Sequence, residues 1–169
     1  MIYKVKVFLS WSGKRSRSHL VADGLHNWVQ KVIHLAEPFL SSDDILVGER
    51  WNGVLERELD TSGFGILCVT KRSLASPWML FEAGALAGSF GNPKRVCPYL
   101  IDLEPEDLSP PLNQFNAAVA DETGTFRMMQ SLNTTSQGQL IPDEILRSSF
   151  KVWWEELAEV IRAAKEKPE

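Results

Sequence analysis

The chain has 169 residues, 44% of them hydrophobic, which is enough apolar material for one ordinary domain with its own core. Its net charge of −4 lacks the basic excess typical of general nucleic-acid binding, and no segment approaches the ~18 apolar residues of a membrane span. The N-terminal run is strand-like and has no signal-peptide pattern. We therefore expect a single cytoplasmic domain over residues 1–169 that contacts neither a membrane nor nucleic acid directly.

Short apolar runs alternate with helix-like segments in the earlier part of the chain. Four of these runs predict strands, at residues 3–10, 36–42, 64–70 and 95–102. Three segments between them predict helices, which begin at residue 16 or cover residues 51–62 and 76–89. The third run is apolar without interruption, as in parallel strands covered on both faces, whereas Pro98 argues against a central position for the fourth.

Helical periodicity also identifies the faces that should be buried. The first helix has apolar residues near one face, namely Leu20, Leu25, Trp28, Val29 and Val32. Weaker patterns predict a short strand over residues 115–120 and a helix over residues 125–132. The strongest helix prediction covers residues 142–167, with an apolar side formed by Leu146, Phe150, Trp153, Leu157, Val160 and Ile161.

The alternation of strands and helices predicts a doubly wound α/β domain with a mostly parallel sheet. In such sheets, ligands bind beyond the carboxyl ends of the strands. The loops that follow the first three predicted strands are therefore the candidates for function, and they cover residues 10–16, 41–50 and 70–78.

Several common catalytic and binding motifs are absent from the sequence. There is no P-loop, no dinucleotide-binding fingerprint and no Gly-x-Ser-x-Gly motif of the serine hydrolases. A phosphoacceptor receiver domain shares the predicted architecture, but it needs acidic residues after the first and third strands. Here the first strand ends in Ser10 and Trp11, and the third ends in Thr70 and Lys71.

The histidines and cysteines do not predict a metal site. His19, His26 and His34 lie on the predicted first helix at intervals of about two turns, which is too far apart to share one ion. Cys68 and Cys97 lack the CxxC spacing of zinc sites and stand in apolar runs, so we expect buried, reduced thiols.

The first loop has the residue types of a phosphate site. It offers Ser12, Gly13, Lys14, Arg15 and Arg17 at the start of a helix, so hydroxyl groups, basic side chains and a helix dipole come together. A solvated loop with a capping serine explains the same residues equally well. The second loop joins acidic residues to an Ile-Leu-Val run, which indicates a lid or a protein-contact loop.

The third loop leads into a helix with an aromatic residue and a carboxylate on one face, because Trp78 and Glu82 are four residues apart. This pair suits cleavage of a glycosidic bond to a flat base, since the ring stacks on the base and the carboxylate stabilises an oxocarbenium-like sugar. A nicotinamide leaving group is already cationic and needs no general acid. The alternative is a glutamate on the solvent face of a packing helix, which spacing alone favours.

Four stretches, in order, resemble TIR (Toll/interleukin-1 receptor) domains. KVFLSWSG resembles the first strand and its loop, and FLSSDDILVGERW is similar to the BB loop of the family. FGILCVTKRSLASPWMLFE resembles the third strand, its loop and the helix that carries Trp-x-x-x-Glu. KRVCPYLID is similar to the fourth strand, in which the family tolerates a proline. The resemblance covers residues 5–102 and is weaker beyond them, apart from the final helix.

This resemblance implies a flavodoxin-like five-stranded parallel sheet with a long C-terminal helix, and cleavage of NAD⁺ to nicotinamide and ADP-ribose or a cyclic isomer. Glu82 occupies the position of the catalytic glutamate of enzymatic TIR domains, and Trp78 matches the tryptophan one turn before it. The two other loops imply contacts with the nucleotide or with a neighbouring domain, through Ser10, Trp11, Ser12, Lys14, Arg15, Asp44 and Trp51. Ser41 is a departure, because the family often has an aspartate there.

We therefore expect an NAD⁺ nucleosidase that takes NAD⁺ as its substrate and uses no other cofactor and no metal. The FEAGALAG segment resembles bacterial TIR proteins, which implies a role in antiphage defence or as an effector. Members of the family often form active sites between neighbouring domains, which implies activation by self-association, with an upstream sensor as a further partner. The alternative is a non-catalytic interaction module that acts through the loop over residues 41–51. The sequence leaves open the trigger, the oligomeric state and the product, which is ADP-ribose, a cyclic isomer or a base-exchange product.

Overall fold

A computed structural model describes residues 4–40, 63–74, 96–110, 112–135 and 138–169 of the chain. The helices predicted over residues 51–62 and 76–89 lie outside these described ranges, and so does the whole loop over residues 41–50 that was predicted to serve as a lid or contact surface.

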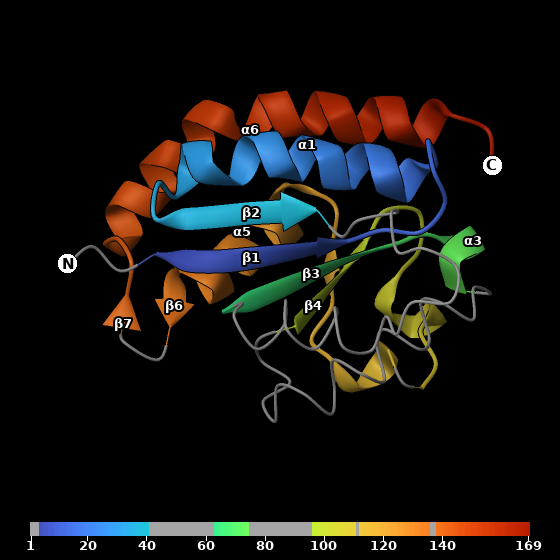
Figure 1. Cartoon of the computed structure of the whole chain (residues 1–169), viewed down its shortest axis with the longest axis horizontal. Helices are drawn as coiled ribbons and strands as arrows, with labels where there is room; N and C mark the ends of the chain where they lie inside the picture. The colour runs from blue at the N-terminus through green and yellow to red at the C-terminus, as the bar shows by residue number, and fades with distance from the viewer. Residues whose placement is uncertain (1–3, 41–62, 75–95, 111, 136–137) are drawn as a thin grey trace, which may run out of the picture.

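Five parallel strands form one sheet in the order β2-β1-β3-β4-β5 (Figure 1). From β1 the chain adds β2 on one side and then crosses to add β3 on the other, so the strand order reverses between β1 and β3. This is the flavodoxin-like order of a doubly wound α/β fold, and it confirms the predicted fold class. The strands are β1 Val5–Ser10, β2 Ala36–Leu40, β3 Phe64–Val69, β4 Val96–Leu100 and β5 Ala118–Val119.

Proline is accommodated in two of these strands by their pairing. Pro98 lies in β4 opposite Leu67 of β3, but the pairing of β4 with β5 begins only at Tyr99. Proline has no N–H to donate to a neighbouring strand. Because no residue of β5 pairs with Pro98, no hydrogen bond between β4 and β5 is lost at this position. Pro38 lies in β2, which is an edge strand, where a missing donor is equally tolerated.

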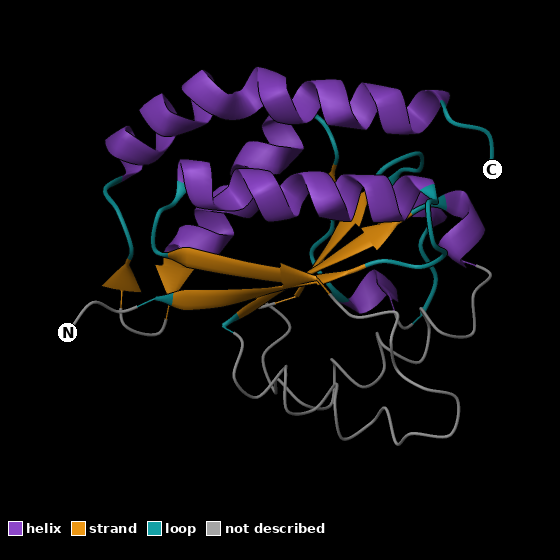
Figure 2. Ribbon diagram, turned by 45° about the horizontal axis from the view of Figure 1, so that its top comes forward, coloured by secondary structure: helices purple, strands orange, loops and turns teal. Residues whose placement is uncertain are grey.

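Two long helices run in opposite directions side by side over one face of the sheet (Figures 1 and 2). They are α1 (Arg17–Val32) and α6 (Asp143–Glu166), and the latter confirms the predicted long C-terminal helix. The Trp28 indole N–H donates to the carbonyl of Trp153 at 2.7 Å, and the Ser149 hydroxyl donates to the carbonyl of Val32 at 3.0 Å. The shorter elements are α3 Lys71–Leu74, η2 Pro105–Asp107, η3 Leu112–Gln114, α5 Glu122–Asn133, β6 Thr134–Thr135 and β7 Gly138–Gln139.

Side chains of alternate strand residues point to opposite faces of the sheet and belong to two apolar clusters, one on each face. In β3, Ile66 and Cys68 belong to the larger cluster, which α1, α5 and α6 cover, whereas Leu67 and Val69 belong to the smaller one. The smaller cluster also contains Leu103, which precedes η2, together with Leu112 of η3 and Phe115, which follows η3. Because β3 is buried on both faces, its uninterrupted apolar sequence is explained.

Several details differ from the sequence prediction. Leu20 is not a core residue, since 37% of it is exposed. The buried face of α1 runs through Ser18, Val21, Ala22 and Leu25, and Leu20 falls beside it. Ser18 can take a core position because its hydroxyl is hydrogen-bonded to the carbonyl of Ser12.

The boundaries of the shorter elements also differ. The helix predicted from residue 125 begins at Glu122, because Asp121 caps it by accepting a hydrogen bond from the Gly124 N–H at 2.7 Å. The strand predicted over residues 115–120 is limited to β5. His34 lies in the turn after α1, which ends at Val32, and not on the helix as predicted.

Candidate functional site

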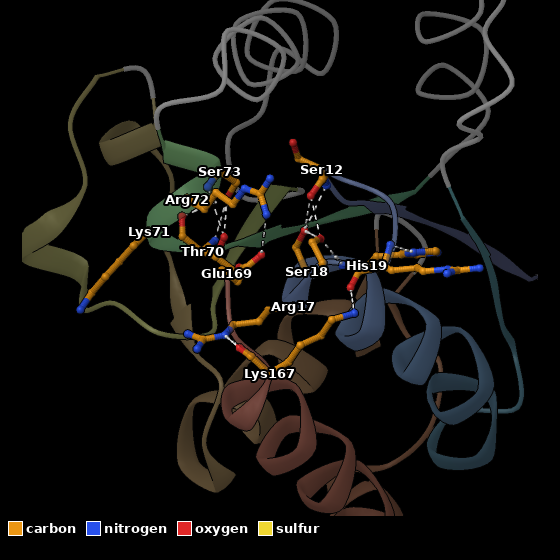
Figure 3. A network of polar contacts seen from close by, with 12 residues as sticks. Ser12, Arg17, Ser18, His19, Thr70, Lys71, Arg72, Ser73, Lys167 and Glu169 are labelled. Carbon is orange, nitrogen blue, oxygen red and sulfur yellow. Dashed lines mark hydrogen bonds and ion pairs between the residues drawn. The ribbon is translucent and has the colours of Figure 1, made fainter.

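The carboxyl ends of β1, β3 and β4 lie at the same edge of the sheet, as parallel strands require. Ser10 ends β1, Val69 ends β3 and Leu100 ends β4, and Ser10 pairs with Leu67 across the reversal in strand order. Ligands bind at this edge in doubly wound folds. The segments that follow these strands form the network of polar contacts drawn in Figure 3.

The β1–α1 loop begins with two buried residues. Ser10 is fully buried and Trp11 is 6% exposed. The Trp11 ring stacks on the imidazole of His19, with the ring centroids 3.8 Å apart and the planes at 15°. Both residues were predicted from the sequence to contact substrate, and the structure places them inside the fold at the base of the loop.

Hydroxyl groups determine the shape of this loop. The carbonyl of Ser12 accepts hydrogen bonds from the hydroxyls of Ser16 at 2.8 Å and Ser18 at 2.9 Å. The Ser12 N–H donates to the Ser18 hydroxyl oxygen at 3.1 Å. Ser16 is also the N-cap of α1, and its oxygen accepts from the His19 N–H. The predicted capping serine is therefore present, and it also folds the loop back on itself.

The basic part of the loop is exposed and has an unusual backbone. Lys14 and Arg15 are both exposed, and Arg15 has a φ of 64°, in the left-handed region that non-glycine residues rarely adopt. Gly13 also has a positive φ, of 87°, which explains the glycine at that position. The Arg15 N–H donates to Nδ1 of His19 at 2.9 Å.

A carboxylate that the sequence did not single out joins two of the loops. Asp102, just beyond β4, accepts from the Arg17 guanidinium at 3.0 Å and from the Lys71 N–H at 2.8 Å. The side chains of Arg17 and Asp102 are 22% and 14% exposed, so this ion pair is largely shielded from water. Asp102 thereby connects the first turn of α1 to the start of α3.

The β3–α3 loop is tied by a reciprocal pair of hydroxyl residues. The Thr70 N–H donates to the Ser73 oxygen at 2.7 Å, and the Ser73 N–H donates to the Thr70 hydroxyl oxygen at 3.2 Å. Both side chains are buried. This arrangement fixes the turn between β3 and α3.

The C-terminal residues reach the same edge (Figure 3). Arg17 donates through Nε to the carbonyl of Lys167 at 2.8 Å, and the Lys167 ammonium donates to the carbonyl of Arg15. Arg72 of α3 pairs with Glu169 at 3.7 Å. Sequence reasoning missed these contacts because residues 97 to 152 positions apart have no pattern that connects them.

Four of the predicted site residues are not placed by the structure. Glu82, Trp78, Asp44 and Trp51 lie outside the described residues, so their roles remain predictions. Among the residues that are described, no group of three His, Cys, Asp or Glu side chains is arranged to hold a metal ion. Within the same ranges, no helix has the length and apolarity of a membrane span.

The strand order and the loops at the carboxyl edge define the chain as a flavodoxin-like α/β protein with a hydroxyl-rich, basic loop after its first strand. The model of the TIR domain family matches residues 7–130, and the chain therefore belongs to the TIR domain family. This confirms the resemblance recognised in the sequence.

One solved structure shows how far the similarity in fold extends. A metazoan TIR-STING receptor from C. gigas matches with a TM-score of 0.56 and 20% sequence identity. The match covers 80% of this chain and 42% of the receptor chain, so this chain spans less than half of that protein. At this level of identity the likeness concerns the fold alone. None of the curated proteins compared with the chain matches it.

Proposed function

We propose that this chain is an NAD⁺ glycohydrolase that releases nicotinamide and leaves ADP-ribose or a cyclic isomer of it. The observation that supports this most directly is the Trp78-x-x-x-Glu82 spacing after the third strand, in a chain of the TIR family. The β3–α3 loop that precedes this motif starts at the carboxyl edge, beside the β1–α1 loop. That edge is where doubly wound folds bind their ligands.

The proposed reaction breaks the bond between the anomeric carbon of ribose and the nicotinamide nitrogen. The bonding electrons leave with nicotinamide, which becomes neutral, and positive charge develops on the ribose. In hydrolysis, water adds to the anomeric carbon and one proton is released. The Glu82 carboxylate stabilises the developing charge and orients the ribose, while Trp78 stacks near the base. NAD⁺ is the substrate, and the reaction requires no other cofactor.

The β1–α1 loop is the proposed binding element for the phosphates of NAD⁺. Lys14 and Arg15 are exposed there, ahead of the N-terminus of α1. Basic side chains together with a helix dipole favour a phosphate group. In this proposal Ser12 contributes from the same loop, while Ser10 and Trp11 support it from below, since both are buried.

Self-association is part of the proposal, because TIR domains associate with one another and with sensor domains. An active site completed by a neighbouring copy predicts low activity in dilute protein and higher activity per molecule in concentrated protein. Asp44 and Trp51 are the proposed contact residues of the loop over residues 41–51. An upstream sensor that brings several copies of this chain together would then trigger the activity.

The test is to incubate concentrated protein with NAD⁺ and to identify the products by mass spectrometry. Nicotinamide together with ADP-ribose or its cyclic isomer is the expected result, with a rate per molecule that rises with protein concentration. Intact NAD⁺ at every concentration, in protein shown by sedimentation to self-associate, would reject the enzyme. That outcome would favour the non-catalytic interaction module.

A further inference from the structure

The last turn of α6 meets the first turn of α1 at the carboxyl edge of the sheet (Figure 3). Lys167 is the C-cap residue of α6, and it contacts the β1–α1 loop through two different groups. Its carbonyl accepts from Nε of Arg17 at 2.8 Å, and its ammonium donates to the carbonyl of Arg15. One residue thus both receives and gives a hydrogen bond across this junction.

The second of these bonds reaches the residue with the least favourable backbone of the loop. Arg15 has a φ of 64°, and such a conformation persists only when the surroundings hold it. Its N–H is bound by Nδ1 of His19, and its carbonyl is bound by Lys167. The peptide groups of Arg15 are therefore held from two sides, by α1 and by the end of α6.

The hydrogen bond between Arg17 and the Lys167 carbonyl connects Lys167 to the other segments at the carboxyl edge of the sheet. The Arg17 guanidinium that binds the Lys167 carbonyl also pairs with Asp102 at 3.0 Å, and Asp102 binds the Lys71 N–H. Arg17 and Asp102 are mostly buried, so this anchor is rigid compared with an exposed pair. The end of α6 is consequently fixed to the segments after β1, β3 and β4 at once.

We propose that Lys167 is a positioning residue for substrate binding. It acts through Arg15, whose backbone it holds so that the side chains of Lys14 and Arg15 are presented to the phosphates of NAD⁺. This inference rests on the proposed function and adds a residue from the far end of the chain to the same site. In this role Lys167 acts through the Arg15 backbone and not on the bond that breaks, so its loss should weaken binding and leave the chemical step unchanged.

The test compares three variants by steady-state release of nicotinamide. Lys167→Met keeps an unbranched side chain of the same length up to Cε and the carbonyl bond to Arg17, but it removes the ammonium. We expect it to raise KM for NAD⁺ roughly 3- to 10-fold with kcat nearly unchanged, because the variant loses one hydrogen bond that affects substrate binding alone. Lys167→Arg keeps a donor and should restore KM. The control is Lys165→Met, an exposed lysine in the same turn, which should leave KM unchanged.

A second measurement does not depend on catalysis. Hydrogen exchange of the backbone over residues 13–19, without NAD⁺, should be faster in Lys167→Met than in the wild type, while the melting temperature stays close to that of Lys165→Met. Unchanged exchange would overturn the positioning role even if the wild type is active. Faster exchange with an unchanged KM would reduce Lys167 to a structural residue, which also overturns the proposal. A wild type that cleaves no NAD⁺ rejects the proposed function instead, and exchange alone then decides whether Lys167 holds the loop.

Discussion

Hydroxyl groups in the β1–α1 loop bind the main chain of that loop, and this is how its serines contribute to the candidate site. Ser16 and Ser18 both donate to the carbonyl of Ser12, and Ser16 also caps α1. The sequence predicted the residue types of a phosphate-binding loop. It did not predict that two of the hydroxyl groups would be hydrogen-bonded to the main chain of the loop itself. Lys14 and Arg15 are the residues that the loop presents to solvent.

The two cysteines provide a test at the scale of single residues. Both are free and buried, as predicted, and burial raises the pKa of the Cys97 thiol to about 12 and that of Cys68 further. We expect neither thiol to react with a thiol-exchange reagent at pH 8 in the native protein, and both to react after unfolding in guanidinium chloride. Rapid labelling of either one without denaturant would contradict the structure.

The same pKa shifts have a consequence for stability. An unfolded thiol ionises near its ordinary pKa of about 8.5, whereas the buried thiols stay protonated to higher pH. The unfolded state therefore binds fewer protons than the folded state in alkaline solution. The contribution of the two thiols to stability is fully present below that pKa and falls as pH rises above it.

At the scale of secondary-structure elements, the close approach of α5 to β5 depends on one glycine. A Cβ atom added to Gly124 would lie 2.1 Å from the carbonyl oxygen of Val119, which is backbone and cannot rotate away. We expect Gly124→Ala to lower the free energy of unfolding by about 3 kcal/mol, as overpacking against a fixed neighbour does. Urea denaturation gives this value directly.

The matched control for that substitution is Ser131→Ala, at an exposed position of the same helix. It removes a hydroxyl without adding any group against β5, so its stability should stay within ~0.5 kcal/mol of the wild type. Equal denaturation midpoints for Gly124→Ala and Ser131→Ala would show that α5 does not pack on β5 as described.

The elements that could be predicted from the sequence are those with a long periodic pattern or a continuous apolar run. Helices α1 and α6 and strand β3 have such patterns, and each was predicted within a few residues. Strand β5 has only two paired residues, so its length depends on its neighbour β4 and not on its own sequence. The position of His34 depended on where α1 ends, which a C-cap hydrogen bond from Ile33 to Val29 decides.

In the whole molecule, the order of the strands could be predicted from the sequence, whereas the contacts between distant segments could not. Alternating strands and helices predicted a parallel sheet, and the resemblance to TIR domains implied its flavodoxin-like order, which the structure confirms. The contact of Lys167 with the β1–α1 loop could not be predicted, because it depends on how far α6 extends along α1. The loops of the candidate site were predictable, and their connection to the C-terminal helix was not.

We propose above all that Glu82 stabilises the ribose during cleavage of NAD⁺. The most direct measurement is the initial rate of nicotinamide release by concentrated wild-type protein and by Glu82→Gln at the same concentration. We expect release by the wild type and a rate at least ~100-fold lower in the variant, because the amide cannot offset developing positive charge. Equal rates in the two proteins would show that Glu82 does not stabilise the ribose.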